Sequence, residues 1–411
     1  MLFLYDLGIR LYRFLVLLAS LKNKKAAAWI NGRKDLLTHI ASQIDRNKTH
    51  VWFHFASLGE FEQGRPVLEE MKTRYPDISI VITFFSPSGY EVRKDYKVAD
   101  HVFYLPLDTR KNAEEFIRMV RPSIAVFTKY EYWYHYFEEL HRKNIPLFIV
   151  SGIFRKDQPF FKWYGGLHRK MLQMVSHFFV QNEISKTLLS SLGLTNVSVT
   201  GDTRFDRVVK NMNQVPRIST VEDFCAGCQV FIAGSTWHDD EVLIASLAKA
   251  YPDWKFIIAP HEVDLRHIAE IKKLFPDSTT LSEIKKGKIN TQVLIIDNIG
   301  TLSSLYQYGD VAYIGGGFGV GIHNTQEASA FSLPVIFGPN YQKFQEAADL
   351  IEKGASFSIN NAQELKQQMS ILQNQETRET LGRIAKEYIT SMAGATSIIL
   401  EYLEDKRLIK P

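Results

Sequence analysis

The chain has 411 residues, of which 45% are hydrophobic and 23% are charged, and its formal net charge is +4. This length is sufficient for two domains of ordinary size, and the composition is that of a folded protein rather than a disordered or fibrous one. So small a net charge does not suggest a nucleic-acid partner. The two cysteines, Cys225 and Cys228, are too few for the four ligands of a structural zinc site, and we interpret them as reduced thiols.

The first 34 residues predict a membrane-anchoring helix. They hold seven basic side chains and one acidic side chain among many leucines, phenylalanines and tyrosines. A membrane span needs about 20 uninterrupted apolar residues, whereas here Asp6, Arg10 and Arg13 interrupt the run on one stripe of a helix. We expect residues 1–34 to lie in the membrane interface, with a span or a helix packed on the protein body as alternatives. The lysines expected to face anionic lipid are Lys22, Lys24 and Lys25.

Residues 35–212 alternate between short apolar runs and segments with helical periodicity. Such repeated βα units predict a parallel, doubly wound sheet, in which ligands bind beyond the carboxyl ends of the strands. The expected strands are 50–56, 78–85, 101–107, 123–128, 146–151 and 176–181, and the expected helices are 61–74, 112–120, 131–143, 160–173 and 183–192.

Glu60 is the most informative residue at these strand ends. It follows Ser57 and Gly59 at the start of an expected helix. An acid in the first turn of a helix is stabilised by the helix dipole and needs no further role. The alternative is a general base, for which burial beside an acceptor hydroxyl would have to offset the lowering of the pKa by the dipole.

Three basic residues also follow expected strands, namely Lys129, Arg155 and Arg204. They are either solvated surface charges or part of a basic cleft for a phosphorylated acceptor, because guanidinium groups match the geometry of phosphate.

Residues 213–385 repeat the βα pattern and predict a second domain of the same class, after a linker at 211–219. The expected strands are 229–233, 255–259, 292–296, 310–314 and 333–337, and a last long helix is expected from about 378 to 404. We expect the segment 386–411 to pack back on the first domain. The sequence Gly234–Ser235–Thr236 before a helix predicts either a phosphate cradle or a plain N-cap.

The stretch from Tyr313 to Glu346 predicts a nucleotide pocket. A strand ends in three glycines, which permit close approach to the backbone, and His323–Asn324 precedes a helix whose N-terminus can bind an anion. Asn324 and Glu327 have the spacing of a capping box, but Glu327 can equally accept hydrogen bonds from a ribose diol. A Walker loop is excluded, because no Gly-Lys-Ser or Gly-Lys-Thr follows.

Eight motifs, in order across both halves, resemble the 3-deoxy-D-manno-octulosonic acid (Kdo) transferases of lipopolysaccharide synthesis. They are HFASLGE (54–60), SPSGYE (86–91), LPLD (105–108), TKYEYW (128–133), FFVQNE (178–183), TGDTRFD (200–206), GSTWHDDE (234–241) and HNTQEASAFSLPVIFGPNYQKFQE (323–346).

The resemblance implies a GT-B glycosyltransferase, with two Rossmann-like domains that face a central cleft. It implies CMP-Kdo as the donor, a lipid A precursor as the acceptor, no further cofactor, and a place at the cytoplasmic face of the inner membrane. It makes Glu60 the catalytic base and places Arg155 and Arg204 on basic positions of the first domain. The residues that fall on donor-side motifs are Ser235, Thr236, His261, Gly316, His323, Asn324 and Glu327.

The sequence departs from the family pattern at three places. The donor-side Pro-Arg-His reads Ala259–Pro260–His261, the paired glycines before His-Asn read Gly321–Ile322, and the Glu-Thr-Glu before the tryptophan reads Lys129–Tyr130–Glu131. We expect these differences to alter contacts rather than chemistry. A UDP-sugar transferase or epimerase of the same fold, and a non-catalytic sugar-nucleotide-binding membrane protein, are the alternative functions.

Overall fold

The computed structural model describes residues 1–45, 47–129, 131–284 and 291–409, and within them the chain forms two compact units. The first unit comprises Met1–Asp206 and Ala393–Pro411, and the second comprises Arg207–Met392. The sequence placed the domain boundary at residues 212 and 213, but the chain divides inside a helix, α10 (Arg204–Met212).

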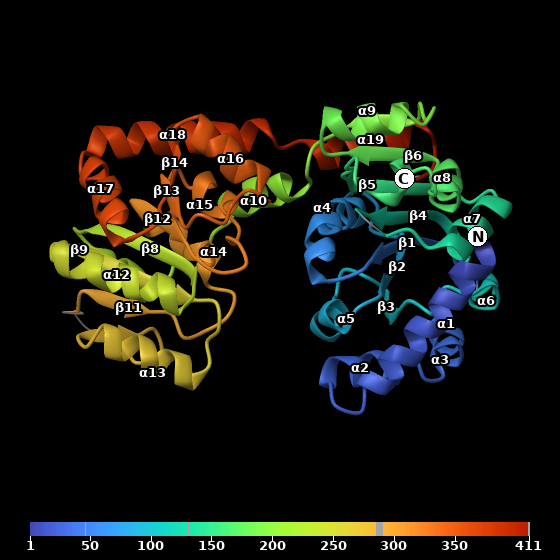
Figure 1. The fold of residues 1–411 in the computed structure, drawn as a ribbon, viewed down its shortest axis with the longest axis horizontal. Helices are drawn as coiled ribbons and strands as arrows, with labels where there is room; N and C mark the ends of the chain where they lie inside the picture. Colours follow the sequence, from blue (N-terminus) through green and yellow to red (C-terminus); the bar gives the residue numbers. More distant parts are fainter. Residues whose placement is uncertain (46, 130, 285–290, 410–411) are drawn as a thin grey trace. The chain divides into compact units, whose positions relative to one another are not determined.

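The first unit contains one parallel sheet, which has seven strands in the described residues, with helices on both faces (Figure 1). The strand order is β3-β2-β1-β4-β5-β6-β7. The strands are β1 (His50–Phe55), β2 (Ser79–Phe84), β3 (His101–Tyr104), β4 (Pro122–Thr128), β5 (Leu147–Gly152), β6 (His177–Val180) and β7 (Val197–Val199). Strands β1 and β2 are buried along their whole length, which explains their nearly continuous apolar sequence.

Two apolar cores lie on opposite faces of this sheet. The first joins it to α3 (Leu36–Gln43), α6 (Arg110–Val120), α7 (Tyr134–Arg142) and α8 (Gly166–Gln173). The second joins it to α4 (Leu58–Arg74) and to α19 (Ala395–Asp405), so the end of the chain packs on the first unit. The remaining helices of this unit are α1 (Leu2–Ala19), α2 (Lys24–Asn31), α5 (Pro87–Arg93), α9 (Glu183–Ser190) and the 3-10 turn η1 (Pro159–Phe161).

The second unit repeats this plan, with the strand order β10-β11-β9-β8-β12-β13-β14 in its described part. Its strands are β8 (Gln229–Thr236), β9 (Trp254–Pro260), β10 (Ser278–Thr280), β11 (Val293–Ile295), β12 (Val311–Ile314), β13 (Val335–Phe337) and β14 (Ser356–Ser358). One face is covered by α12 (His238–Ala250), α13 (Leu265–Leu274) and α17 (Ala362–Leu372), and the other by α11 (Ser219–Cys225), α14 (Leu302–Leu305), α15 (Gln326–Ala330) and α16 (Gln345–Glu352). The 3-10 turn η2 (Tyr306–Tyr308) and α18 (Gln375–Ser391) complete it.

Each sheet has one place where the strand order reverses. In the first sheet β1 pairs with both β2 and β4, and in the second β8 pairs with both β9 and β12. In parallel sheets of this kind, ligands bind at the carboxyl ends of the two strands that flank the reversal. The candidate ligand-binding segments are therefore those that follow β1 and β4 in the first sheet, and those that follow β8 and β12 in the second.

Several expected helices are shorter than predicted. The helix expected from 378 to 404 is two helices, α18 and α19, because Gly394 between them has a φ of +121°, which no helical residue adopts. The helix expected over 160–173 is the turn η1 followed by α8, and the one expected over 1–34 is α1 followed by α2. Strands β7, β10 and β14 were not predicted, because each has only three residues and lies at or beside a sheet edge.

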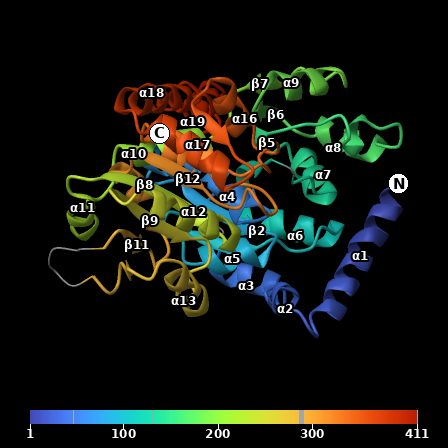
Figure 2. The same ribbon diagram turned by 60° about the vertical axis from the view of Figure 1, so that its left-hand side comes forward.

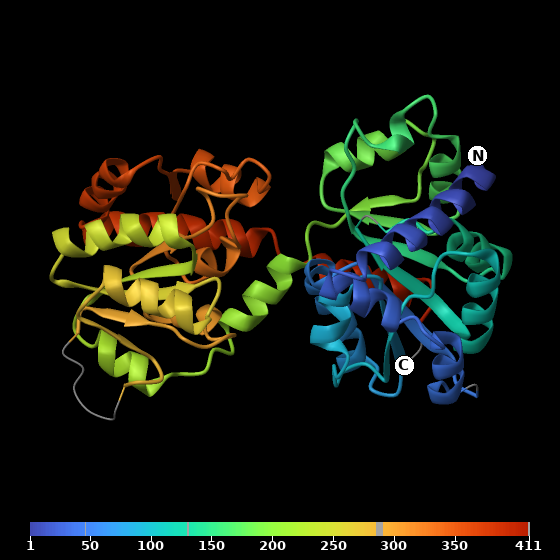
Figure 3. The same ribbon diagram turned by 60° about the horizontal axis from the view of Figure 1, so that its bottom comes forward.

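Helix α1 lies along the outside of the first unit and buries none of its own residues (Figures 2 and 3). It is held near its start, where the Tyr5 hydroxyl donates to Asp108 at 2.5 Å and Asp6 lies 2.6 Å from His135 Nε2. None of the helices in the described ranges is long and apolar enough to cross a membrane. The exposed large apolar side chains of α1 include Phe3, Leu4, Leu7, Leu11, Phe14, Leu15 and Leu18.

Close backbone packing in the second unit generates a test of stability. A Cβ atom added to Gly317 would lie 2.6 Å from Gly338 N, whereas one added to Gly319 would meet only Gly316 O, at 3.6 Å. Gly317→Ala should therefore cost about 1–3 kcal/mol of unfolding free energy, through forced movement of packed backbone. Thermal or urea unfolding measures this, and Gly319→Ala is the matched control. Equal stability of the two variants would contradict the described packing.

Candidate active site

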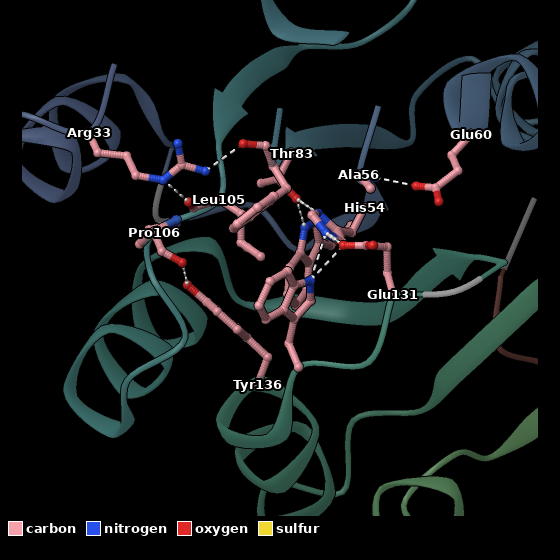
Figure 4. A network of polar contacts seen from close by, with 12 residues as sticks. Arg33, His54, Ala56, Glu60, Thr83, Leu105, Pro106, Glu131 and Tyr136 are labelled. Atoms are coloured by element: carbon pink, nitrogen blue, oxygen red, sulfur yellow. Dashed lines mark hydrogen bonds and ion pairs between the residues drawn. The ribbon is translucent and has the colours of Figure 1, made fainter. Parts of the chain in front are cut away.

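Glu60 lies beyond the carboxyl end of β1, at the reversal of the first sheet. It is in the first turn of α4, which begins at Leu58 after the N-cap residue Ser57. The backbone N–H of Ala56 donates a hydrogen bond to Glu60 Oε2 at 2.5 Å (Figure 4). A Cβ added to Gly59 would have only Ser57 Oγ, at 3.9 Å, within contact range, so the space beside Glu60 is open there.

The carboxyl group of Glu60 is strongly perturbed. Burial raises its pKa to about 8, and the nearby carboxylate of Glu131 contributes in the same direction. The N–H groups of Ala56 and Ser57 and the charge of Lys129 oppose this rise in pKa but do not cancel it. The effect of the helix terminus, which would lower the pKa, is therefore outweighed, and the environment is one that tunes a carboxylate toward general-base chemistry.

Glu131 follows β4, the other strand at the reversal, and is held by a buried network. Its Oε2 atom accepts a hydrogen bond from Trp133 Nε1 at 2.8 Å and lies 3.1 Å from His54 Nε2. His54 is itself buried, and its Nδ1 lies 2.8 Å from the hydroxyl of Thr83 (Figure 4). Sequence reasoning assigned no role to Glu131 or His54. Glu131 lies three residues after an expected strand, which could have marked it as a site residue. The sequence alone, however, does not show which strands are neighbours in the sheet.

The predicted basic residues of the first unit are in different surroundings. Lys129 has a φ of +63° after β4, and its charge lowers the pKa of both Glu60 and Asp202. Arg204 donates to Asp202 Oδ2 through Nε at 2.9 Å. Burial raises the pKa of Asp202, but Arg204 outweighs burial and the net pKa is below its usual value. Arg155 is exposed, and none of the described residues pairs with its guanidinium.

Asp202 links this basic region to the helix that carries Glu60. Its Oδ2 atom accepts a hydrogen bond from Gln63 Nε2, in α4, at 3.1 Å. The structure thus brings together Ser57, Gly59 and Glu60 at the start of α4, with the charges of Lys129 and Glu131 near Glu60. Arg204 is joined to the same helix through Asp202.

Three stacked rings mark the corresponding edge of the second sheet. The centroid of His261, directly after β9, is 4.9 Å from that of Trp237 and 4.3 Å from that of His323. Burial, followed by the neighbouring charge of His261, lowers the pKa of His323 to about 4. Its ring is therefore neutral at physiological pH, which fits the donation from Trp237 Nε1 to His323 Nε2 at 3.2 Å.

The predicted cradle at Ser235 and Thr236 is part of β8 rather than of a helix N-terminus. Ser235 has a φ of +54°, and its carbonyl lies against Gly315. Thr236 is buried, and its hydroxyl donates to Glu241 at 2.9 Å. The backbone N–H of His261 donates to the carbonyl of Thr236 at 3.0 Å, which aligns the ends of β8 and β9.

Asp240 fixes the glycine loop. Its carboxylate accepts hydrogen bonds from Gly316 N at 2.9 Å, from the Tyr313 hydroxyl at 2.7 Å and from Trp237 N at 2.9 Å. Gly316 has a φ of +88°, so an L-residue would be strained there. The glycines were predicted to admit a ligand. Around Gly317, however, the close neighbour is the backbone at Gly338, so that glycine serves packing within the protein.

Glu327 is the second residue of α15, which begins at Gln326 after the N-cap Thr325. Asn324 therefore does not form the predicted capping box; its Oδ1 accepts from Gln326 N at 3.0 Å instead. Burial raises the pKa of Glu327, and Arg207 and Asn324 partly oppose this rise. Arg207 was not predicted, because it lies in α10, just after the motif TGDTRFD (200–206), and the sequence gives no sign that its charge acts on Glu327.

Glu327 also lines a cavity of about 210 Å³ at the edge of the second unit. The other lining residues are Val208, Asn211, Gln214, Val215, Pro216, Ser303, Ser304 and Phe331. Among the residues that the structure describes, no three His, Cys, Asp or Glu side chains gather as a candidate metal site.

Comparison with known proteins shows which glycosyltransferases the chain resembles in sequence. Residues 31–207 match the family model described as 3-deoxy-D-manno-octulosonic-acid transferase. The chain is 28% identical over 372 residues to the 3-deoxy-D-manno-octulosonic acid transferase of Haemophilus influenzae, and the match covers 86% of each chain. The chain is a glycosyltransferase related to the Kdo transferases.

A second relative is longer. The chain is 26% identical over 353 residues to a bifunctional glycosyltransferase/methyltransferase of Fusobacterium nucleatum. The match covers 81% of this chain but only 54% of the Fusobacterium protein, so the chain spans about half of that protein's length.

The fold is shared more widely than the sequence. UDP-GlcNAc 2-epimerase of Neisseria meningitidis superposes with a TM-score of 0.62 at 17% identity, covering 87% of the chain and all of the epimerase. This likeness shows the GT-B architecture of two parallel-sheet units, and at such low identity it carries no statement about the reaction.

Direct titration tests the electrostatic description of the site. The side-chain carboxyl of Glu60, followed by carbon-13 NMR, should titrate near pH 8. Glu131→Gln removes the neighbouring negative charge but keeps a carbonyl oxygen for Trp133, so the midpoint should fall. Glu70→Gln, farther along α4, is the control and should leave the midpoint unchanged. A wild-type midpoint between pH 4 and 5 would contradict the assignment.

Proposed function

We propose that the chain transfers Kdo from CMP-Kdo to a hydroxyl group of a lipid A precursor, with inversion at the anomeric carbon. The observation that carries this proposal is the perturbed carboxyl of Glu60, which lies at the strand reversal of the unit that matches the Kdo transferase model. A carboxylate with a pKa of about 8 is a stronger base than an ordinary glutamate, whose pKa is about 4.3.

The reaction is a single displacement. The acceptor oxygen forms a bond to the anomeric carbon of Kdo as the bond from that carbon to the phosphate oxygen of CMP breaks. Glu60 takes the proton of the acceptor hydroxyl, and CMP leaves with the electron pair of the broken bond. The scheme requires no metal and no cofactor besides the donor itself.

The second unit is proposed to hold the donor. Glu327 accepts hydrogen bonds from the ribose diol, a role supported by its place on the wall of a cavity. The backbone of the glycine loop around Gly316, whose own N–H is bound to Asp240, lies beside the phosphate together with polar groups of Asn324. The remaining proposed donor contacts are Ser235, Thr236, His261 and His323.

The first unit is proposed to hold the acceptor beside Glu60. Ser57 and Gly59 form the open side of the site, and Lys129 and Arg155 provide positive charge for a phosphorylated acceptor. Arg204 is already bound to Asp202, so its proposed part is to keep the basic region in place while it contributes charge.

Replacing Glu60 separates chemistry from binding. Glu60→Gln keeps the size of the side chain but removes the base, so kcat should fall by about 10²–10⁴-fold. CMP should still raise the thermal midpoint of the variant as much as that of the wild type, because the nucleotide contacts the other unit.

In the wild type, kcat should rise with pH through about 8, since only the ionised form of Glu60 accepts a proton. Protection by UDP instead of CMP would favour a UDP-sugar enzyme. Unchanged turnover in Glu60→Gln would contradict the base assignment.

We further propose that α1 lies in the cytoplasmic face of the inner membrane, where the lipid acceptor is located. The support is its row of exposed apolar side chains, of which Phe3 is 76% exposed, and the lysines that follow it. The helix would thereby hold the site at the surface in which its substrate resides.

Vesicle binding tests this placement. Leu7→Asp combined with Phe14→Asp should abolish co-sedimentation with vesicles that contain phosphatidylglycerol, while the unfolding midpoint stays unchanged because both residues are exposed. Leu265→Asp, at a 90% exposed leucine of the second unit, is the control. Binding of the double variant at the wild-type level would contradict the proposal.

A further inference from the structure

A cavity of about 550 Å³ lies beneath α1 in the first unit, in addition to the region around Glu60. We call it the α1–α3 pocket, because most of its wall comes from α1, α2 and α3. The rest comes from residues 33–35 between α2 and α3, from Pro106 and Leu107 after β3, and from Asn112 in α6. A volume of this size is in the range of small-molecule binding sites. The lining residues are Arg13, Leu17, Trp29, Ile30, Arg33, Lys34, Asp35, Leu36, Leu37, Thr38, Pro106, Leu107 and Asn112.

Most of the wall is apolar and comes from four separate chain segments. Leu17 reaches it from α1, Ile30 from α2, Leu37 from α3 and Leu107 from the segment that precedes α6. Such a wall offers few hydrogen bonds to water, whereas a hydrocarbon chain bound there would bury its apolar surface, which is favourable. The pocket therefore fits a flexible apolar group better than a polar metabolite.

The polar part of the wall is basic. Its charged lining residues are three bases, Arg13, Arg33 and Lys34, and a single acid, Asp35. Arg13 and Lys34 are exposed, and none of the described residues is hydrogen-bonded to or paired with their charged groups. The pocket thus joins an apolar interior to an edge with excess positive charge, which complements an acylated molecule that also carries a phosphate.

The guanidinium of Arg33 is bound by backbone carbonyls rather than by a carboxylate. It donates to the carbonyl of Leu105 at 3.0 Å (Figure 4), and to those of Trp29 at 3.2 Å and Phe85 at 2.8 Å. No carboxylate pairs with it in the described part of the chain. Two of its five N–H groups remain available. The indole N–H of Trp29, a residue 4% exposed, likewise has no hydrogen-bond partner among the described residues.

A continuous set of contacts connects the pocket to the candidate active site. The Arg33 guanidinium lies over the Phe85 ring, 5.1 Å from its centroid, and Phe85 packs against Trp133 with centroids 4.7 Å apart. Trp133 donates to Glu131, whose charge contributes to the raised pKa of Glu60. Figure 4 shows Arg33 and Glu60 at opposite ends of this region, with Glu131 between them.

We propose that the α1–α3 pocket is the lipid subsite of the acceptor. One acyl chain of the acceptor enters the apolar interior, and an acceptor phosphate lies at the edge formed by Arg13 and Lys34. This inference rests on the proposed function and adds to it the part of the substrate that the pocket selects. An acceptor held in this way keeps its sugar hydroxyl toward Glu60 while its other chains stay in the membrane.

The test compares pocket variants with a matched variant on the same helix. The double variant Arg13→Gln with Lys34→Gln removes charge from the edge, and Leu37→Trp fills the interior. Arg10→Gln removes one charge from an exposed position of α1 that does not line the pocket. Each full-length protein is assayed in detergent micelles for binding of the acylated, phosphorylated glucosamine disaccharide without donor, and for transfer to the acylated and to the fully deacylated disaccharide.

We expect both pocket variants to bind the acylated disaccharide about tenfold more weakly or worse, with KM raised in proportion and kcat kept. Leu37→Trp should leave KM for the deacylated disaccharide unchanged, and Arg10→Gln should behave as the wild type. Equal affinities of the pocket variants and Arg10→Gln would overturn the proposal. So would equally tight binding of phosphatidylglycerol, since the pocket would then hold any anionic lipid. The binding assay decides this even if no transfer occurs, a result that would contradict only the proposed reaction.

Discussion

The reversal of strand order in each seven-stranded parallel sheet is the constraint on which the rest of the structure depends. In the first unit it makes β1 and β4 neighbours and so brings the carboxylates of Glu60 and Glu131 near each other. Burial is the main cause of the raised pKa of Glu60, and the like charge of Glu131 adds to it, because two neighbouring carboxylates cannot both ionise at low cost. In the second unit the same reversal brings the end of β8 to the glycine loop after β12.

The chemistry of the two edges differs, although their topology is the same. At the first edge the raised pKa of Glu60 depends on burial, with Trp133 and His54 holding Glu131 in place. At the second edge the carboxylate of Asp240 accepts three hydrogen bonds from within the protein, and these hold the glycine loop in place. One edge is thus arranged to accept a proton, and the other presents fixed backbone and the neutral imidazole ring of His323 to a ligand.

Much of the fold could be predicted from the sequence, because buried parallel strands have nearly continuous apolar runs and the polar residues after them mark one edge of a sheet. Glu60 was singled out in this way, whereas His261 and Gly316 were named as site residues because they fall on motifs of the Kdo transferases. Glu131 and Arg207 were missed, because their partners are set by strand order and by contacts between distant segments. Of the two interpretations that the sequence allowed for Asn324 and Glu327, the capping box is not formed, since the N-cap residue is Thr325 and the helix begins at Gln326.

We propose that this chain joins Kdo from CMP-Kdo to a lipid acceptor, and mass measurement of the lipid product tests this directly. The purified full-length protein is incubated with CMP-Kdo and a lipid A precursor. We expect a product heavier by one or more Kdo residues, with release of CMP in equal number. An unchanged acceptor, under conditions in which the Haemophilus influenzae transferase converts it, would show that the proposed reaction is wrong.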